Sequence, residues 1–296
     1  MDWDKLRVFH AVAEAGSFTH AGETLNLSQS AVSRQISALE DSLHVPLFHR
    51  HARGLILTEQ GELLFRTARE VFAKLSMTEA MLSESKEHPK GPLKVTTTVA
   101  FGSMWLTPRV REFLGIYPDV KLSLLLDDDE LDLSMREADI AIRLTQPRQP
   151  DLIQRHLMSI RVHVYANRDY LNRRGTPQTL ADLDQHDIIA YPRETKAPVP
   201  NINWLLDIGD PPMGERATAL RVNSQYAILQ AVKGGLGIAA IPDFMAEGDG
   251  ELVRILPDLS GPRIDAYFVY PEELRHSKRI AVFRDFLVKK VAETQF

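Results

Sequence analysis

Apolar positions in the first 58 residues recur every three or four places, which predicts three short helices. The first covers residues 2–14 and ends at Gly16, a residue suited to a helix C-terminus. Ser17 and Ser28 are candidate N-caps for the second and third helices. Apolar residues on either side of Gly54 then predict a short hairpin within residues 45–58. This order of elements predicts a winged helix-turn-helix, an all-α-dominated domain of residues 1–58.

The third helix carries polar side chains on the face opposite its apolar stripe. Arg34 can form two parallel hydrogen bonds with guanine, and Gln29 can do the same with adenine. Free N–H groups after Ser28 can hold a phosphate, and Arg53 on the hairpin is placed to enter a narrow minor groove. The candidate DNA-binding residues are Ser28, Gln29, Ser30, Ser33, Arg34, Arg50 and Arg53. The alternative, that they are ordinary solvated surface positions, stays open, for Ser30 above all.

No proline interrupts residues 59–87, which predicts one long helix. Its apolar positions alternate in steps of four and three, the spacing of a coiled-coil seam. The seam consists of Leu64, Ala68, Val71, Leu75, Thr78 and Leu82. The helix could lie on its own domain, but Phe65 and Phe72 beside the seam favour a second copy as its partner. We therefore assign residues 59–88 to a linker and dimerisation helix and residues 89–92 to a hinge.

Beyond residue 92, short apolar runs alternate with helical patterns, which predicts an α/β domain. The predicted strands are 93–98, 120–126, 140–144, 162–166, 188–191, 220–222, 238–241 and 264–270. The predicted helices are 105–116, 130–137, 225–233 and 278–292. Residues 196–214 are rich in Pro and Gly and predict a loop. Ligands of such a domain bind at the carboxyl ends of the strands.

Composition and charge restrict the function. The 296 residues carry 35 Lys and Arg against 40 Asp and Glu, a net charge of −5 that argues against a protein coating nucleic acid by charge alone. There is no cysteine, and hence no disulfide or thiolate metal site. No apolar run is long enough to span a membrane, and the first residues lack the pattern of a signal peptide. A cytoplasmic protein without membrane contact is expected.

Several segments resemble the LysR-type transcriptional regulators, and the likeness extends over essentially the whole chain. They are residues 17–48 with the helix-turn-helix, Ala138–Arg143, Gly175–Pro177 and Gly234–Pro242. The resemblance implies a two-lobed, periplasmic-binding-protein-like effector domain at 93–296, with lobe I at 93–162 and 268–296 and lobe II at 163–267. It also implies homodimers that assemble into homotetramers on double-stranded promoter DNA, controlled by a small-molecule effector between the lobes.

Three positions depart from the usual pattern of that family. Gly22 stands where alanine is usual and costs about 1 kcal/mol in helix propensity, but glycine allows two helices to approach closely. His44 stands where glycine usually ends the recognition helix, and histidine tolerates the left-handed conformation better than most residues. Ser30 replaces a frequent proline, so a contact with a base or phosphate differs.

Candidate effector-binding residues lie at strand ends and helix starts. Those near the first strand precede the helix predicted at 105–116, whose free N–H groups favour an anion. The full set is Thr98, Phe101, Gly102, Ser103, Asp127, Arg143, Thr145, Asn223 and Ser224. Hydroxyls with one arginine suggest an anionic or amino-acid-like effector. The alternative is that these residues serve only as caps and turns.

Enzyme-like patterns fail on their context. Residues 235–240 match G-x-G-x-x-A but follow a helix and enter a strand, the reverse of a dinucleotide-binding fingerprint. The acidic run 127–130 lacks the ligand spacing of a calcium loop, and His49 and His51 lack further zinc ligands nearby. We expect no catalytic residues, no cofactor and no metal. The alternative to a regulator is a cytoplasmic small-solute-binding module with an interaction domain that does not bind DNA.

Overall fold

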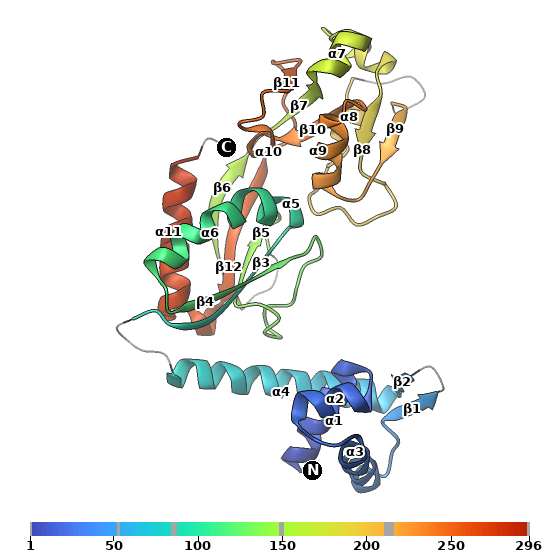
Figure 1. The fold of residues 1–296 in the computed structure, drawn as a ribbon, viewed down its shortest axis with the longest axis vertical. Coiled ribbons are helices and arrows are strands. Elements are labelled where there is room, and N and C mark those ends of the chain that lie inside the picture. The colour runs from blue at the N-terminus through green and yellow to red at the C-terminus, as the bar shows by residue number, and fades with distance from the viewer. Residues whose placement is uncertain (1, 52–53, 84–87, 148–150, 210–215, 295–296) are drawn as a thin grey trace. The chain divides into compact units, whose positions relative to one another are not determined.

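The computed structural model describes residues 2–51, 54–83, 88–147, 151–209 and 216–294. The chain forms two compact units, Met1–Ser83 and Glu84–Phe296 (Figure 1). In the described parts of both units, no helix is long and apolar enough to cross a membrane.

The first unit contains the three predicted helices and the hairpin. Its elements in chain order are α1 (Trp3–Ala15), α2 (Phe18–Leu25), α3 (Gln29–Leu43), β1 (Phe48–His51), β2 (Gly54–Leu57) and α4 (Glu59–Ser83). The apolar stripes of α1 and α3 meet in one core, in which Phe9, Val32 and Ile36 are fully buried. Both predicted serine N-caps are present: Ser17 Oγ accepts from His20 N–H, and Ser28 Oγ accepts from Ala31 N–H.

Two departures from the family pattern have a structural reason. A Cβ atom on Gly22 would lie 2.6 Å from the Leu27 carbonyl oxygen, so the tight turn between α2 and α3 requires glycine here. His44 ends α3 with φ 57°, in the left-handed region. The predictions for both residues, close approach and left-handed geometry, are confirmed.

Helix α4 uses one of its faces to cover its own unit. The ring of Phe72 lies 4.8 Å from that of Trp3 and 4.9 Å from that of His10, and the Phe65 ring lies 5.5 Å from His10. The expectation that Phe65 and Phe72 need a second copy is therefore wrong, because α1 already provides their partner.

The predicted seam of α4 is divided between two surroundings. Ala68 is buried and Leu64 packs against the core of its own unit, whereas Val71, Leu75 and Thr78 are exposed. Residues 84–87 and the side chain of Leu82 lie outside the described part of the chain.

The second unit contains two five-stranded sheets. The first has the order β4-β3-β5-β12-β6, formed by Val120–Leu126, Gly91–Thr97, Ile140–Arg143, Ile264–Pro271 and Leu152–Ile160. The second has the order β11-β7-β10-β8-β9, formed by Leu252–Ile255, Val162–Asn167, Ile238–Pro242, Ile188–Ala190 and Thr218–Arg221. The chain enters the second sheet at Val162 and has returned to the first by Ile264, which pairs with Ile160. Residues 264–267, expected in lobe II, thus belong to the first sheet.

Helices pack against both sheets (Figure 1). The first sheet carries α11 (Lys278–Ala292) and a continuous helical run made of α5 (Val99–Phe101), a π-helical turn at Gly102–Leu106 and α6 (Thr107–Ile116). The second sheet carries α7 (Arg168–Arg174), α8 (Trp204–Asp207), α9 (Gln225–Lys233) and α10 (Asp243–Ala246). Short 3-10 helices lie at Ala181–Gln185 and Glu272–Leu274. In the shared core, the rings of Phe113 and Phe283 meet edge to face at 5.0 Å.

The prediction of a helix at residues 130–137 is wrong. Asp132 Oδ1 accepts from Ser134 N–H at 2.8 Å, Glu137 Oε2 accepts from Asp132 N–H at 2.6 Å, and Arg136 has φ 59°. These side-chain bonds hold a turn, because short acidic side chains compete with the helix for backbone N–H groups.

Two strands, β6 and β11, were not predicted, and both lie at the edge of a sheet. Exposed Gln154, Arg155 and His156 in the middle of β6 interrupt the apolar pattern by which a strand is recognised. Charged side chains are typical of edge strands, which must avoid pairing with other chains. Periodicity alone therefore misses them.

Candidate DNA-binding surface and effector cleft

The N-terminal end of α3 presents a polar, exposed surface. Ser28, Gln29 and Ser30 are all exposed, and the hydroxyls of Ser28 and Ser30 lie 3.1 Å apart. Arg34, one turn further on, is exposed, and its Nε donates to the Ser30 carbonyl at 3.3 Å. Ser33 is half-buried. The first N–H groups of a helix have no acceptor within the helix, so this end can receive an anion.

The hairpin candidates are described only in part. Arg50 lies in β1, where its backbone pairs with Leu55. The side chain of Arg50 and the whole of Arg53 lie outside the described part of the chain.

Two residues that sequence reasoning did not select fix the hairpin to the helices. Glu40 Oε1 accepts from the N–H groups of Leu47 and Phe48, at 2.7 and 3.3 Å. Thr58 Oγ1 donates to the Pro46 carbonyl at 2.7 Å and accepts from Gly61 N–H at 3.0 Å. A carboxylate seven residues before a buried backbone turn gives no periodic signal, so only the folded chain reveals this role.

The second unit contains a wide cleft of about 1710 Å³ and a recess of about 50 Å³ that shares part of its lining. The recess is lined by strand residues from both sheets, whereas the strand residues of the wide cleft come from the first sheet, and loop residues 198–202 line both cavities. The recess is mostly apolar, with walls that include Phe101, Ile160, Val199 and Phe244. Of the predicted residues, Thr98 and Phe101 line the recess, and Arg143 and Thr145 line the wide cleft.

The helix start that was expected to bind an anion already has a carboxylate. The helical run begins at Val99, six residues earlier than predicted, and Val99 N–H donates to Asp128 Oδ1 at 3.0 Å. Asp128 therefore occupies the position at which an anionic ligand would be stabilised. The neighbouring Asp127, which the sequence suggested instead, accepts from Asp129 N–H at 3.0 Å within the loop.

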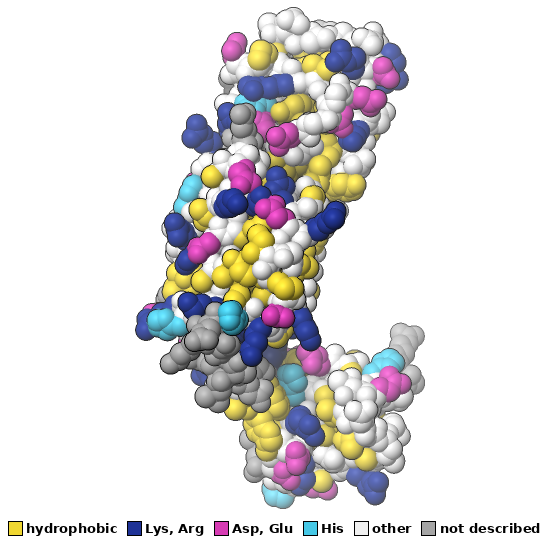
Figure 2. All heavy atoms as spheres, turned by 60° about the vertical axis from the view of Figure 1, so that its left-hand side comes forward, with side chains coloured by type: hydrophobic (Ala, Val, Ile, Leu, Met, Phe, Trp, Pro, Cys, Tyr) yellow, Lys and Arg dark blue, Asp and Glu magenta, His cyan; other side chains and the backbone are white. Residues whose placement is uncertain are grey.

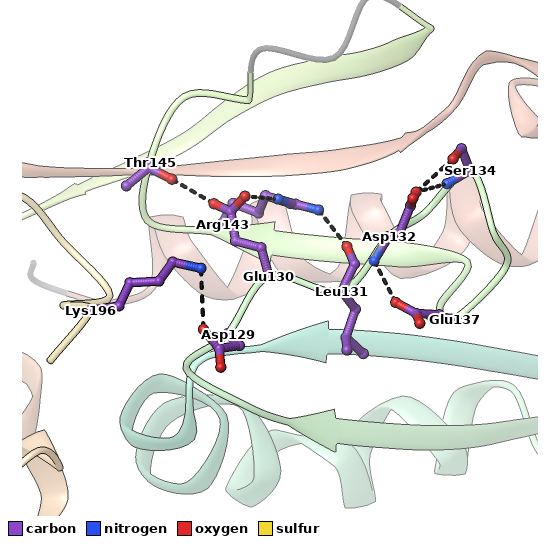
Figure 3. Close-up of polar contacts among 9 residues, drawn as sticks. All are labelled: Asp129, Glu130, Leu131, Asp132, Ser134, Glu137, Arg143, Thr145 and Lys196. Atoms are coloured by element: carbon purple, nitrogen blue, oxygen red, sulfur yellow. Dashed lines mark hydrogen bonds and ion pairs between the residues drawn. The ribbon is translucent and has the colours of Figure 1, made fainter. Parts of the chain in front are cut away.

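Arg143 is also paired with a carboxylate of the protein itself. Its side chain is only 7% exposed and forms an ion pair with Glu130, while its Nη2 donates to the Leu131 carbonyl at 2.7 Å (Figure 3). Thr145 Oγ1 donates to the same carboxylate at 2.9 Å. Lys196 Nζ forms an ion pair with Asp129 Oδ1 at 3.1 Å, which Figure 3 also shows.

Burial changes the acid–base properties of this region. It raises the pKa of Asp128, an effect that the charges of Asp127 and Asp129 increase and the bond from Val99 N–H opposes. Burial also raises the pKa of Tyr191, and the carboxylates of Asp128 and Asp129 add to that increase. The carboxylates of Asp127, Asp128 and Asp129 therefore act on one another and on Tyr191.

Besides Asp127, four of the predicted effector residues line neither cavity, and three of these four have other contacts. A Cβ on Gly102 would lie 2.2 Å from the Leu126 side chain, so this glycine permits close packing. Ser103 is exposed on the helical run. Ser224 Oγ caps α9 by accepting from Ala227 N–H at 3.3 Å, and the Asn223 carbonyl accepts from Tyr191 OH at 3.0 Å. For Gly102, Asn223 and Ser224, the alternative interpretation as cap, turn and packing residues fits the geometry.

Several residues of the recess escaped sequence reasoning. They include Asp128, Trp204, Gln225, Phe244 and Met245. Asp128 directly follows the predicted Asp127, and Gln225 directly follows the predicted Ser224. The prediction therefore located the correct segments but selected a neighbouring side chain in each. Trp204 belongs to α8, which lies within the stretch expected to be a loop.

Charge on the outside of the second unit is mixed. Figure 2 shows Lys and Arg side chains intermingled with Asp and Glu over one face of it. Opposite charges interspersed in this way produce no strong field on that face.

Comparison with known proteins agrees with this architecture. Residues 3–62 match the bacterial regulatory helix-turn-helix protein, lysR family, and residues 86–292 match the LysR substrate binding domain. The transcriptional regulator CrgA of Neisseria meningitidis serogroup C is 31% identical over 292 residues, which cover 97% of this chain and 96% of CrgA. A CrgA structure superposes with a TM-score of 0.63 at 29% identity, covering 98% of this chain and 99% of that one. Full-length AphB, a virulence activator of Vibrio cholerae, gives a TM-score of 0.62 at 26% identity and covers 98% of this chain and 99% of its own.

A helix-turn-helix unit joined to a two-sheet ligand-binding unit defines a DNA-binding transcription regulator with an effector domain. The chain belongs to the family of LysR-type transcriptional regulators.

Proposed function

We propose that this chain binds a promoter sequence-specifically through the N-terminal end of α3 and responds to a small molecule held between the lobes of its second unit. The observation that carries the proposal is the exposed polar surface of Ser28, Gln29, Ser30 and Arg34 at the start of α3, where Ser28 is the N-cap. We assign the chain to the cytoplasm and to regulation without catalysis.

In this proposal, α3 enters the major groove with its N-terminal residues against base edges. Arg34 recognises guanine and Gln29 adenine, each through paired hydrogen bonds. The free N–H groups at the helix start, together with Arg50 on the hairpin, hold the backbone and set the register without carrying sequence information, and Arg53 enters a narrow minor groove.

Two copies act together. The exposed positions Val71, Leu75 and Thr78 on α4 supply the apolar surface for a second α4. Two such dimers then form the tetramer that binds promoter DNA.

The test is a titration of operator DNA with the full chain. Arg34→Ala is expected to cost about 1–3 kcal/mol at the cognate site and to relax base preference at one position. Arg7→Ala is the matched control, because Arg7 is an exposed arginine on α1. Unchanged base preference in Arg34→Ala would refute the assignment.

The same titration separates this function from its alternative. A solute-binding module with an interaction domain that does not bind DNA would fail to retard DNA from upstream of its own gene.

A further inference from the structure

The recess in the second unit has one charged group in its wall. Of the described residues that line it, only Asp128 is charged, and its other neighbours are mainly apolar. Asp128 is half-buried. A carboxylate in such a place without a cationic partner is costly, because it loses hydration that a single hydrogen bond does not replace. The bond from Val99 N–H occupies only Oδ1 of this carboxylate.

The two cations nearest in the cleft are already paired. Arg143 binds Glu130, and Lys196 lies 3.1 Å from Asp129. The acidic run 127–130 thus keeps more negative charge than these two cations neutralise. An added carboxylate ligand would meet repulsion here, whereas a cation would be attracted.

Two further oxygen atoms at the recess lack a hydrogen-bond partner. Gln225 Nε2 donates to the Ala240 carbonyl at 3.1 Å, which leaves Gln225 Oε1 buried with no donor. Thr98 Oγ1 is likewise buried and unpartnered. Buried polar atoms are almost always hydrogen-bonded. A ligand with several N–H groups would supply the missing hydrogen bonds to both oxygen atoms.

Trp204 Nε1 is a third unpartnered atom at the recess, but it is a donor and has a different neighbour. A Cβ on Gly261 would lie 2.6 Å from it, so this edge of the indole packs against the backbone of Gly261.

We propose that the recess binds the primary ammonium group of a small amine whose apolar part extends into the wide cleft. This inference rests on the proposed effector role of the cleft and names the chemical class of the effector. An ammonium group has three donors and no acceptor. These match three acceptors in the wall of the recess, namely the Asp128 carboxylate, Gln225 Oε1 and Thr98 Oγ1. The rings of Phe101 and Phe244, 5.7 Å apart and edge to face, add an aromatic wall that favours a cation.

The cavity volumes agree with an ammonium group in the recess and a larger apolar part in the wide cleft. The recess of about 50 Å³ accommodates only a few non-hydrogen atoms, since a single water already needs about 10–15 Å³. Loop residues 198–202 and Trp204 line both cavities, so the recess and the wide cleft adjoin. Of the anionic or amino-acid-like effector suggested by the sequence, the ammonium part has a partner in the recess, whose described lining residues include no cation for a carboxylate part.

The experiment is isothermal titration of the full chain at neutral pH with benzylamine, benzyl alcohol and benzoate. Benzylamine is expected to bind at least tenfold more tightly than either of the others. Asp128→Asn keeps an oxygen for Val99 N–H but removes the charge, so it should weaken benzylamine binding at least tenfold and leave benzyl alcohol unchanged. Asp258→Asn, at an exposed aspartate of the second unit that lines neither cavity, is the matched control and should change neither.

A second variant protects the test against a folding defect in the first. Gln225→Met keeps the apolar contacts and removes the orphaned oxygen, and it should weaken benzylamine binding about threefold. The inference is overturned if benzoate binds more tightly than benzylamine, if benzylamine does not bind, or if neither variant changes its affinity. A gel-shift with operator DNA, measured on the same samples, tests the proposed function separately. If the chain still retards the DNA but does not bind the amine, only the proposed effector class is rejected.

Discussion

His163 and Tyr165 both bind the carboxylate of Asp243, at 2.6 and 3.0 Å. His163 and Tyr165 are neighbours on the same face of β7, and Asp243 starts α10, next to recess residue Phe244. Burial, together with the charge of Asp243, raises the pKa of Tyr165 to about 12. This small network joins α10 to the second sheet at the point where the chain has just left the first.

The raised pKa of Tyr165 predicts a specific loss of stability in alkali. In the unfolded chain a tyrosine ionises near pH 10, whereas Tyr165 in the folded protein keeps its proton until about pH 12. Its stabilisation is therefore complete below pH 10 and is lost between about pH 10 and 12, by up to about 2 kcal/mol. Urea unfolding across this range should show a decline in wild type that Tyr165→Phe lacks.

Tyr226→Phe is the control for this measurement, because Tyr226 is exposed. It should follow the wild-type decline. The same decline in Tyr165→Phe as in wild type would contradict the role given to Tyr165.

At the scale of elements, α4 carries two functions on two faces. Phe65 and Phe72 cover the core of their own unit, and Val71 and Leu75 remain exposed, Leu75 by 44%. The sequence pattern of steps of four and three predicts an apolar stripe but cannot say which neighbour covers each part of it.

Leu75→Glu is expected to shift the protein from dimer to monomer in sedimentation velocity. A charge at this position would be desolvated against the second helix, at a cost of several kcal/mol. Unfolding of the first unit should change little, since Leu75 lies outside its core. Lys74→Glu is the control at the adjacent exposed position, and an equal loss of dimer in both variants would exclude Leu75 from the interface.

The helical run at 99–116 shows how a neighbouring element changes the start of a helix. The sequence predicts a start near Trp105, with Gly102 and Ser103 preceding the helix. Asp128, from the loop after β4, binds Val99 N–H and lets the helix begin at Val99. A cap that comes from 29 residues away in sequence has no local signal.

For the whole molecule, charge limits how DNA is bound. With a net charge of −5, the chain cannot rely on general attraction to phosphates. Each first unit offers Arg34, Arg50 and Arg53 as candidate contacts, hence six cations in one dimer of the tetramer, which is all that a DNA fragment with a single dimer site can engage. The logarithm of operator affinity should therefore fall with the logarithm of salt concentration at a slope no steeper than about −5.

Fluorescence anisotropy over a series of salt concentrations gives this slope. Arg50→Ala should reduce its magnitude by about one for each phosphate that the arginine no longer neutralises, hence by about two in a dimer. A wild-type slope near −10 would mean that other cations of the chain contact DNA.

The sequence by itself determined the order of the units, the serine caps of the first unit, the hairpin, and most strands of the second. These follow from local rules, because caps, turns and apolar periodicity depend on residues only a few positions apart. It also located the segments that line the cleft, since residues after strand ends gather at one edge of a sheet.

Only the tertiary structure decided which side chains of those segments face the ligand and what charge they present. Asp128 occupies the helix start, Glu130 neutralises Arg143, and Gln225 turns an unpartnered oxygen toward the recess. Such contacts join residues from different elements. Their effect on a bound molecule depends on the sum of charges and hydrogen bonds that the complete fold brings together.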